Sequence, residues 1–283
     1  MFKLKDWIDQ DKINWFGLST NPSAGAISLL EKNQDKICWH GLSENPSAGA
    51  ISLLEKNQDK IDWDMLSFNP SALTLLEKNQ DNINWYCLSA NPSERALTLL
   101  EKNQSEIDWT RLSANPSARA IALLEKNQDK INWTWLSRNP AALTLLEKNQ
   151  DKIHWTMLSK NPSERAIALL EKNQNKINWT RLSMNPSARA IALLENNQDK
   201  IDWTQLSENP SAITLLENNQ DKIDWVQLSR NPAIFEYDYK GMKDAMYNGI
   251  KEDLVKNRFH PKNIPKFRDW GMDGFEDYED EDE

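Results

Sequence analysis

Hydrophobic and polar residues recur along this chain in a block of about 24 residues, and the block predicts helices. In the block at 115–138, the apolar residues fall on one face of a helix: Ala120, Ile121, Leu123 and Leu124. Asn115 is a suitable N-cap, and Pro116 fits the first helical position, where its missing N–H is not needed. We therefore predict an 11-residue helix over 116–126.

A second, shorter helix is predicted in the same block. Asn127 follows the last helical Lys and is a candidate for a left-handed residue that ends the first helix. Ile131 then points inward from an extended link. The residue before each repeated Trp is Asn or Asp in eight of ten blocks, which is again an N-cap preference. We therefore expect a one-turn α or 3-10 helix over 133–137, with Trp133 and Leu136 facing the core.

Tryptophan marks the period of the repeat. Ten of the 13 Trp residues follow each other at steps of 24, 24 and 22 residues, and they are predicted to form a ladder in the core: Trp15, Trp39, Trp63, Trp85, Trp109, Trp133, Trp155, Trp179, Trp203 and Trp225. The 22-residue blocks lack two residues at the start of the longer helix, as at 69–73. Each third block should therefore enter its helix differently.

These patterns predict an all-α, right-handed solenoid of ten ~24-residue coils, each with a three-turn helix and a one-turn α or 3-10 helix. A single coil buries too little apolar surface to fold alone, so neighbouring coils supply the stability. We expect an N-terminal cap at 1–14, the solenoid at 15–233 and a helical C-terminal cap at 234–275. The acidic end at 276–283 should be disordered.

Two resemblances arise from these residues. The run Leu-Ser-x-Asn-Pro-Ser-Ala-x-Ala-Ile-x-Leu-Leu-Glu-Lys-Asn resembles leucine-rich variant repeats, which alternate α and 3-10 helices in a right-handed superhelix; the invariant Trp departs from that pattern. Residues 11–233 are also similar to tandem-repeat proteins of giant nucleocytoplasmic DNA viruses, with units of the form LSxNPxAIxLLExNxDKIxW. This second resemblance implies a viral origin, and the C-terminal segment extends it.

The charge and the cysteine content of the chain limit its possible partners and its possible location. The net charge is -9, and seven of the acidic residues lie within 276–283, so the body of the chain is close to neutral. Its bulk charge gives no reason to bind nucleic acid or an anionic membrane. The two cysteines, Cys38 and Cys87, have no disulfide or metal spacing. We expect the host cytoplasm or a virion, and neither secretion nor a membrane span.

The sequence offers little for catalysis. The three histidines, His40, His154 and His260, are far apart, and there is no glycine-rich phosphate loop or nucleophile elbow. The repeated Glu at the position of Glu125 suggests a solvated row. The repeated Asn at the position of Asn127 either ends helices or forms a hydrogen-bonded ladder between coils. We therefore expect neither an enzyme nor a cofactor or metal site.

The positions that vary between coils are the most informative about function. They are the two residues after each Trp and the one after each Leu-Ser, all on the short helices. Large apolar residues on such a surface favour partner contact, and the predicted partner-binding residues are Phe68, Tyr86, Trp135, Met157 and Met184. We expect a non-catalytic scaffold that binds a host or virion protein. The alternatives are a structural part of the virion and, less favoured, a nucleic-acid-binding repeat protein.

Overall fold

The computed structural model describes residue 5, residues 8–236 and residues 238–253. The chain divides into two compact units, Met1–Asn231 and Pro232–Glu283. The described residues of the first unit form α-helices, 3-10 helices and short links, without any β-strand. In the described part of the chain, no helix is both long enough and apolar enough to cross a membrane.

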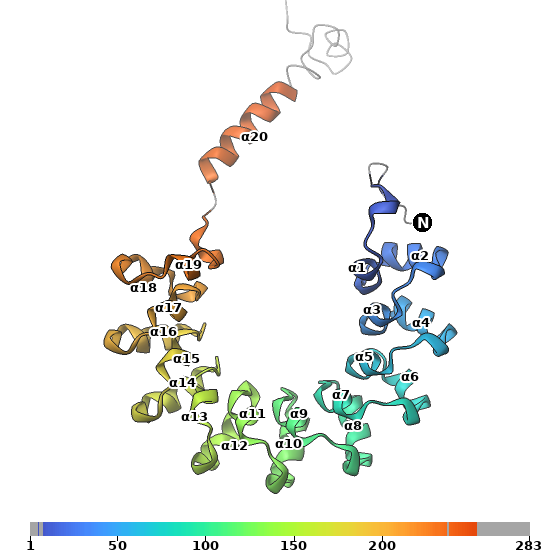
Figure 1. Cartoon of the computed structure of the whole chain (residues 1–283), viewed down its shortest axis with the longest axis horizontal. Coiled ribbons are helices and arrows are strands. Elements are labelled where there is room, and N and C mark those ends of the chain that lie inside the picture. The colour runs from blue at the N-terminus through green and yellow to red at the C-terminus, as the bar shows by residue number, and fades with distance from the viewer. Residues whose placement is uncertain (1–4, 6–7, 237, 254–283) are drawn as a thin grey trace, which may run out of the picture. The chain divides into compact units, whose positions relative to one another are not determined.

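The first unit is an α-solenoid in which a short helix begins at each of the ten repeated Trp residues (Figure 1). We call the segment from one such Trp to the residue before the next a coil. The short helices are α1 (Trp15–Thr20), α3 (Trp39–Glu44), α5 (Trp63–Phe68), α7 (Trp85–Ala90), α9 (Trp109–Ala114), α11 (Trp133–Arg138), α13 (Trp155–Leu158), α15 (Trp179–Ser183), α17 (Trp203–Ser207) and α19 (Trp225–Leu228).

A second helix follows each of the first nine short helices; it has more residues than the short helix in six coils and the same number in three, and we call it the longer helix throughout. These helices are α2 (Ala24–Lys32), α4 (Ala48–Lys56), α6 (Leu73–Lys78), α8 (Glu94–Lys102), α10 (Ala118–Lys126), α12 (Leu143–Lys148), α14 (Glu164–Glu171), α16 (Ala188–Glu195) and α18 (Ile213–Glu217). A three-residue 3-10 helix then completes each of these coils, as at Gln128–Lys130. This 3-10 helix replaces part of the extended link that the sequence predicts.

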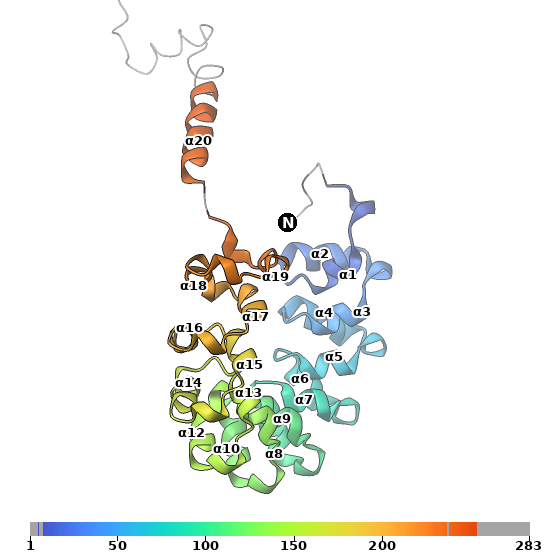
Figure 2. The ribbon, with the colours of Figure 1, turned by 60° about the vertical axis from the view of Figure 1, so that its left-hand side comes forward.

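Successive coils stack side by side, so that the helices form two rows. Each short helix packs on the short helix of the next coil along most of the unit, and longer helices pack likewise, as α2 does on α4. Within this unit the short helices lie along the inner side of the curved stack, and the longer helices lie along its outer side (Figure 1). Figure 2 shows the two rows from the side, most clearly for α1–α6 and α14–α19. The right-handed sense of the superhelix stays a prediction.

The short helices form as the sequence predicts. Asn132 caps α11 by accepting the backbone N–H of Trp135, and equivalent bonds begin nine of the ten short helices. His154 also caps, through its ring nitrogen, although it is neither Asn nor Asp. Cys38 makes no such bond, because its side chain lacks an oxygen acceptor.

The longer helix ends at Lys126 as predicted, but its start and the conformation of the residue after it differ from the prediction. Helix α10 begins at Ala118, and its N-cap is Ser117 rather than Asn115. At its other end Asn127 has φ -129°, so it is not left-handed. Its side-chain Nδ2 instead donates to the carbonyl of Leu123, at 2.9 Å. This bond satisfies a carbonyl of the last turn within the same coil, so Asn127 ends the helix, and the alternative of a ladder between coils does not hold at this position.

The 22-residue coils confirm the predicted irregularity. Helix α12 has six residues where α10 has nine, and the 3-10 turn Pro140–Ala142 precedes it. Here Asn139 caps the turn directly by accepting from the backbone N–H of Ala141, at 3.0 Å. The loss of two residues therefore removes the Ser-capped first turn of the longer helix.

A row of buried asparagines joins the coils, and these are the Asn residues of the Asn-Pro pairs. Asn115 is 1% exposed. Its Nδ2 donates to the carbonyls of Ser89 and Asn91 in the preceding coil, at 3.1 and 3.0 Å, and its Oδ1 accepts from the backbone N–H of Ser117. At least one such bond to the preceding coil recurs in the same place, from Asn45, Asn69, Asn91, Asn139, Asn161, Asn185, Asn209 and Asn231. We call this row the asparagine spine.

The serine of each Leu-Ser pair closes its own coil. Ser113 is fully buried and donates to the carbonyl of Trp109, at 2.7 Å. Its Oγ also accepts the backbone N–H of Asn132, 19 residues later, at 3.0 Å. The same serine bond fixes the start of the following short helix in every coil from the first to the ninth.

The tryptophan ladder exists, but it lies at the margin of the core. Leu and Ile residues form the buried centre, and the nine Trp side chains from Trp15 to Trp203 are only partly buried against it. Trp225, in the last coil, is 64% exposed. A lysine from the 3-10 helix of the same coil covers the ring in seven coils; Lys152 Nζ lies 4.9 Å from the centre of the Trp133 ring. The expectation that the Trp residues lie in the core is therefore met only in part: the rings lie at its edge, and in seven coils a lysine stem and charge cover one ring face.

The described part of the second unit contains the 15-residue helix α20 (Tyr239–Asp253). Tyr239, Met242, Met246 and Tyr247 on this helix are exposed. Its role as a C-terminal cap stays a prediction. Residues 254–283, which include the rest of the predicted cap and the acidic end, lie outside the described residues, as do residues 1–4 and 6–7 of the predicted N-terminal cap.

The asparagine spine predicts a large difference between two Asn→Ala substitutions in one coil. Asn115→Ala removes the hydrogen bonds to two buried carbonyls and one partly buried N–H, so it should lower the free energy of unfolding by about 3–5 kcal/mol. Asn127→Ala removes one partly exposed bond and should lower it by about 1 kcal/mol. Urea denaturation of both variants measures the difference, and equal losses would contradict the structural role given to the spine.

Two tryptophans on α11 give a second prediction. Trp133→Ala should lower the free energy of unfolding by about 2–3 kcal/mol. This loss is smaller than that for truncating a fully buried aromatic residue, because one ring face is covered only by Lys152. Trp135→Ala should lower it by less than ~1 kcal/mol, as a surface change. Thermal melts of the two variants check this order. A larger loss for Trp135→Ala would show that the faces of α11 are misassigned.

Candidate interaction site on the short helices

The variable residues of the short helices form one continuous surface, which we call the inner ridge. It comprises the two residues after each repeated Trp and the residue after each Leu-Ser pair. The Leu and Ser of the Leu-Ser pairs are buried in the second to ninth coils, so most of the variable residues face away from the core. Because the short helices line the inner side of the stack, the ridge lies on that side (Figure 1).

The five residues that the sequence singles out all lie on the inner ridge, with unequal exposure. Tyr86, Trp135 and Met184 are 46%, 40% and 42% exposed. Phe68 and Met157 are half-buried. The first three are therefore the more accessible to a partner. Phe16, on α1, is also exposed but was not among the five.

The first coils of the ridge are held by polar contacts between neighbours. The rings of Phe16 and His40 stack with their centres 6.4 Å apart, and His40 Nδ1 lies 2.7 Å from a carboxylate oxygen of Asp62. Partial burial raises the pKa of Asp62, but its hydrogen bonds with His40 and the backbone N–H of Met65 outweigh burial and leave that pKa below its ordinary value. Asp62 therefore stays ionised, so the N-cap beside this part of the ridge carries a negative charge.

Tyr86 is already engaged by a neighbour in the next coil. The guanidinium of Arg111 lies over the Tyr86 ring, 4.2 Å from its centre, and also donates a hydrogen bond to the Tyr86 hydroxyl. The stacking fixes the ring on the surface and leaves part of it exposed. An aromatic ring held in one orientation loses little entropy when a partner covers it.

The sixth to eighth coils carry a different kind of surface. Their ridge residues are Thr134, Trp135, Arg138, Thr156, Met157, Lys160, Thr180, Arg181 and Met184, with no acidic residue among them. Burial lowers the pKa of Lys160, and the nearby charges of Arg181 and Arg138 lower it further. Three positive charges therefore lie close together among one Trp and two Met side chains.

On the outer row of longer helices, the arginines form ion pairs with the preceding coil. Arg119 on α10 binds Glu101 of the preceding coil through two nitrogens, with Nη2 2.6 Å from the carboxylate. The same pairing joins Arg95 to Glu77, Arg165 to Glu147 and Arg189 to Glu171. Hydrogen bonds from Arg119 and Arg189 hold the pKa of Glu101 and of Glu171 below its ordinary value. The predicted solvated Glu row is therefore, in these coils, a row of ion pairs between coils.

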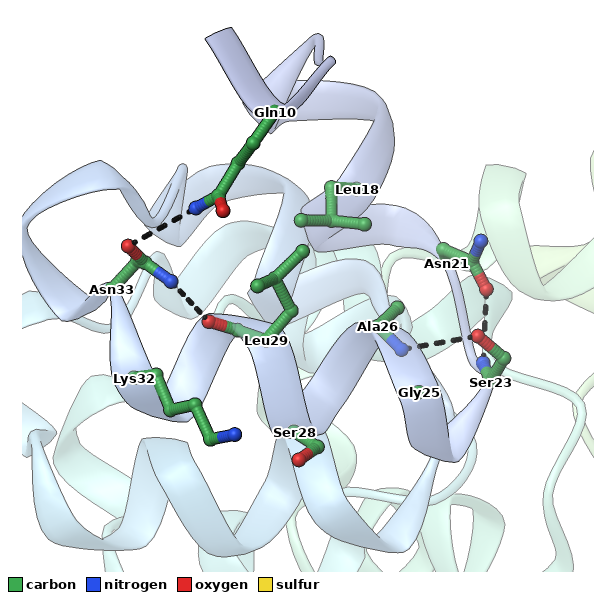
Figure 3. Close-up of a pocket in the computed structure, with 10 residues that line it drawn as sticks. All are labelled: Gln10, Leu18, Asn21, Ser23, Gly25, Ala26, Ser28, Leu29, Lys32 and Asn33. Carbon is green, nitrogen blue, oxygen red and sulfur yellow. Dashed lines mark hydrogen bonds between the residues drawn. The ribbon is translucent and has the colours of Figure 1, made fainter. Parts of the chain in front are cut away.

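A hollow of about 570 Å³ lies at the start of the stack, away from the inner ridge. Figure 3 shows the side chain of Gln10 reaching to Asn33, with Leu18 to its right and Leu29 below it. In later coils the residues equivalent to Leu29 and Asn21 are covered by the preceding coil; Leu53 and Asn45 are both buried. Among the described residues no complete coil precedes the first one, and the hollow lies on the face that a preceding coil covers elsewhere. Lys32 is its one charged residue, which does not suggest a catalytic site.

The described residues offer no group of three or more His, Cys, Asp or Glu that could hold a metal ion. The two cysteines are free thiols, and burial together with the charge of Asp64 raises the pKa of Cys87. A raised pKa keeps that thiol protonated and weakly nucleophilic. The inner ridge can bind a partner through exposed aromatic, Met and basic side chains, which are held on rigid helices.

The sequence pattern located the ridge but missed its basic cluster. Arg138, Lys160 and Arg181 were recognised only as variable positions. A signal was present, because the N-cap residues around these coils are Asn132, His154 and Asn178, whereas Asp is frequent elsewhere.

Comparison of the chain with family models, with curated proteins and with solved structures finds no match in any of the three.

Proposed function

We propose that this protein is a non-catalytic scaffold that binds a partner protein along the inner ridge of its solenoid. The observation that carries the proposal is the exposure of Tyr86, Trp135 and Met184 on short helices whose remaining positions are fixed by the fold. Trp and Tyr are common anchors of protein interfaces, and Met adapts to irregular partner surfaces. A viral origin, which the repeat pattern suggests, and a host or virion partner are parts of the same proposal.

The shape of the repeat supports this function. The asparagine spine and the Leu core repeat almost unchanged from coil to coil, so they specify the fold and leave the ridge free to vary. A solenoid of this kind presents a long surface whose parts are held at fixed distances. A partner could therefore contact several coils at once without any rearrangement of the scaffold.

Replacing three exposed ridge residues should abolish partner capture without unfolding the chain. The variant Tyr86→Ser, Trp135→Ser, Met184→Ser removes aromatic and thioether contacts but disturbs no buried side chain, so its melting temperature should change little. Affinity capture from the native source, read by mass spectrometry, should show loss of a protein that the unmodified chain retains.

A matched change on the outer row provides the control. Charge reversal of three exposed residues, Lys56→Glu, Lys102→Glu and Lys126→Glu, alters the other face of the stack and should leave capture intact. Retention of the captured protein by the ridge variant, together with its loss from the outer-row variant, would show that the opposite face binds the partner.

A further inference from the structure

Three basic side chains of the inner ridge lack the ion pairs that the arginines of the longer helices form. On the outer row, Arg95, Arg119, Arg165 and Arg189 each bind a Glu of the preceding coil. Seven lysines lie over Trp rings. By contrast, Arg138, Lys160 and Arg181 form no ion pair with any described residue.

The three unpaired charges also repel one another. The charges of Arg138 and Arg181 both act on Lys160, which is partly buried between the two neighbouring coils. Acidic residues are missing from the three variable columns and from the N-cap positions of these coils, Asn132, His154 and Asn178. An anionic group that covered this surface would relieve the repulsion and gain three opposite charges.

Apolar side chains lie among these charges. Trp135 precedes Arg138 by three residues on α11, and Arg181 Nη1 lies 3.8 Å from the sulfur of Met184 in the eighth coil. Trp135 and Met184 are both exposed, at the two ends of the cluster. A ligand matched to this surface therefore needs negative charge together with apolar anchors, and it needs to reach across three coils.

The acidic parts of the ridge favour a short ligand. Asp64 on the ridge and the N-cap Asp62 lie on one side of the cluster, and Glu208 on the ridge and the N-cap Asp202 lie on the other. They would repel a long phosphate backbone that followed the ridge. Packed helices lie ~8–10 Å apart, so the cluster spans roughly 20 Å, which is about six extended residues at ~3.3 Å each.

We propose that the surface formed by Trp135, Arg138, Met157, Lys160, Arg181 and Met184 binds an acidic peptide segment that carries aromatic or aliphatic anchors. This inference rests on the proposed function and names the partner chemistry. Acidic side chains of the segment meet the three basic residues, and its apolar side chains pack on Trp135 and Met184. The rest of the partner extends along the ridge in either direction.

Fluorescence anisotropy with the full chain tests the proposal. The probe is a fluorescein-labelled peptide of sequence Glu-Asp-Phe-Glu-Asp-Leu-Glu-Asp. The variant Arg138→Gln, Lys160→Gln, Arg181→Gln should bind it about tenfold more weakly, as three partly exposed charge pairs together predict. Binding by the unmodified chain should weaken as salt is raised from roughly 0.05 M to 0.3 M, because these charges are screened.

The outer row offers a matched control with the same change in net charge. The variant Arg95→Gln, Arg119→Gln, Arg165→Gln removes three arginines that are already paired with Glu. It should bind the probe as the unmodified chain does. Equal weakening in the two triple variants would show that net charge alone governs binding, and it would overturn the assignment of the site.

The apolar part of the site needs its own comparison. Trp135→Ser with Met184→Ser should weaken binding of the probe, but it should not affect a second peptide in which Ser replaces both Phe and Leu. If the chain binds both peptides equally, the apolar anchors have no role and the proposal fails. Tighter binding of a single-stranded oligothymidine of eight nucleotides than of the probe would identify a nucleic-acid site and overturn the proposal.

Two further outcomes separate this proposal from the proposed function. If the probe does not bind while the ridge variant still loses native capture, the partner chemistry is wrong and the ridge remains the interface. If deletion of residues 276–283 from the chain strengthens probe binding about tenfold, those acidic residues compete for the surface, and the proposal of a separate acidic partner is overturned. Probe binding that depends on the three basic residues supports it.

Discussion

Hydrogen bonds from the asparagine spine are the interaction on which the rest of the structure depends. Where each short helix turns into the next segment, backbone carbonyls such as those of Ser89 and Asn91 become buried at the junction with the following coil. A buried carbonyl without a hydrogen-bond partner costs about 1–3 kcal/mol. Two coils whose junction left these carbonyls without donors would therefore not pack stably on each other. The side-chain nitrogen of Asn115 donates both bonds, and its side-chain oxygen accepts from a backbone N–H in the turn of its own coil. Register between coils is thus set by polar bonds, whereas apolar contacts set the strength of the stack.

This division of roles explains what the sequence could predict. The Trp and Leu periods, the Asn or Asp caps of short helices and the shortened third coil are local patterns, and the structure confirms them. The spine was missed because Asn115 has a second plausible role as a helix cap, and only the position of the preceding coil shows which role it fills. The same reason applies to Arg119, whose partner Glu101 lies 18 residues away. Contacts between coils depend on stacking geometry, which no single repeat displays.

Burial of tryptophan shows a similar limit. The sequence shows that Trp133 is invariant in its column, but an invariant residue can be fixed by a surface contact as well as by a core. Lys152 covers the ring from the 3-10 helix of the same coil, and the equivalent lysine is replaced by Asn82 in the third coil and by Glu106 in the fourth. The ladder therefore depends on charge as well as on packing. On the inner ridge, sequence variation revealed the candidate positions, but the unpaired state of Arg138 and Lys160 required knowledge of their neighbours.

The direction of the spine bonds has a consequence for how the chain is built. In every junction the amide of the later coil donates to carbonyls of the earlier coil, as Asn115 does to Ser89 and Asn91. A ribosome releases the earlier coil first, so each emerging coil meets acceptors that are already in place. Stacking can therefore follow synthesis one coil at a time, from the first Trp toward the last, with each new coil using the previous one as its template. Such growth limits how long any apolar face stays uncovered in a chain that has no single central core.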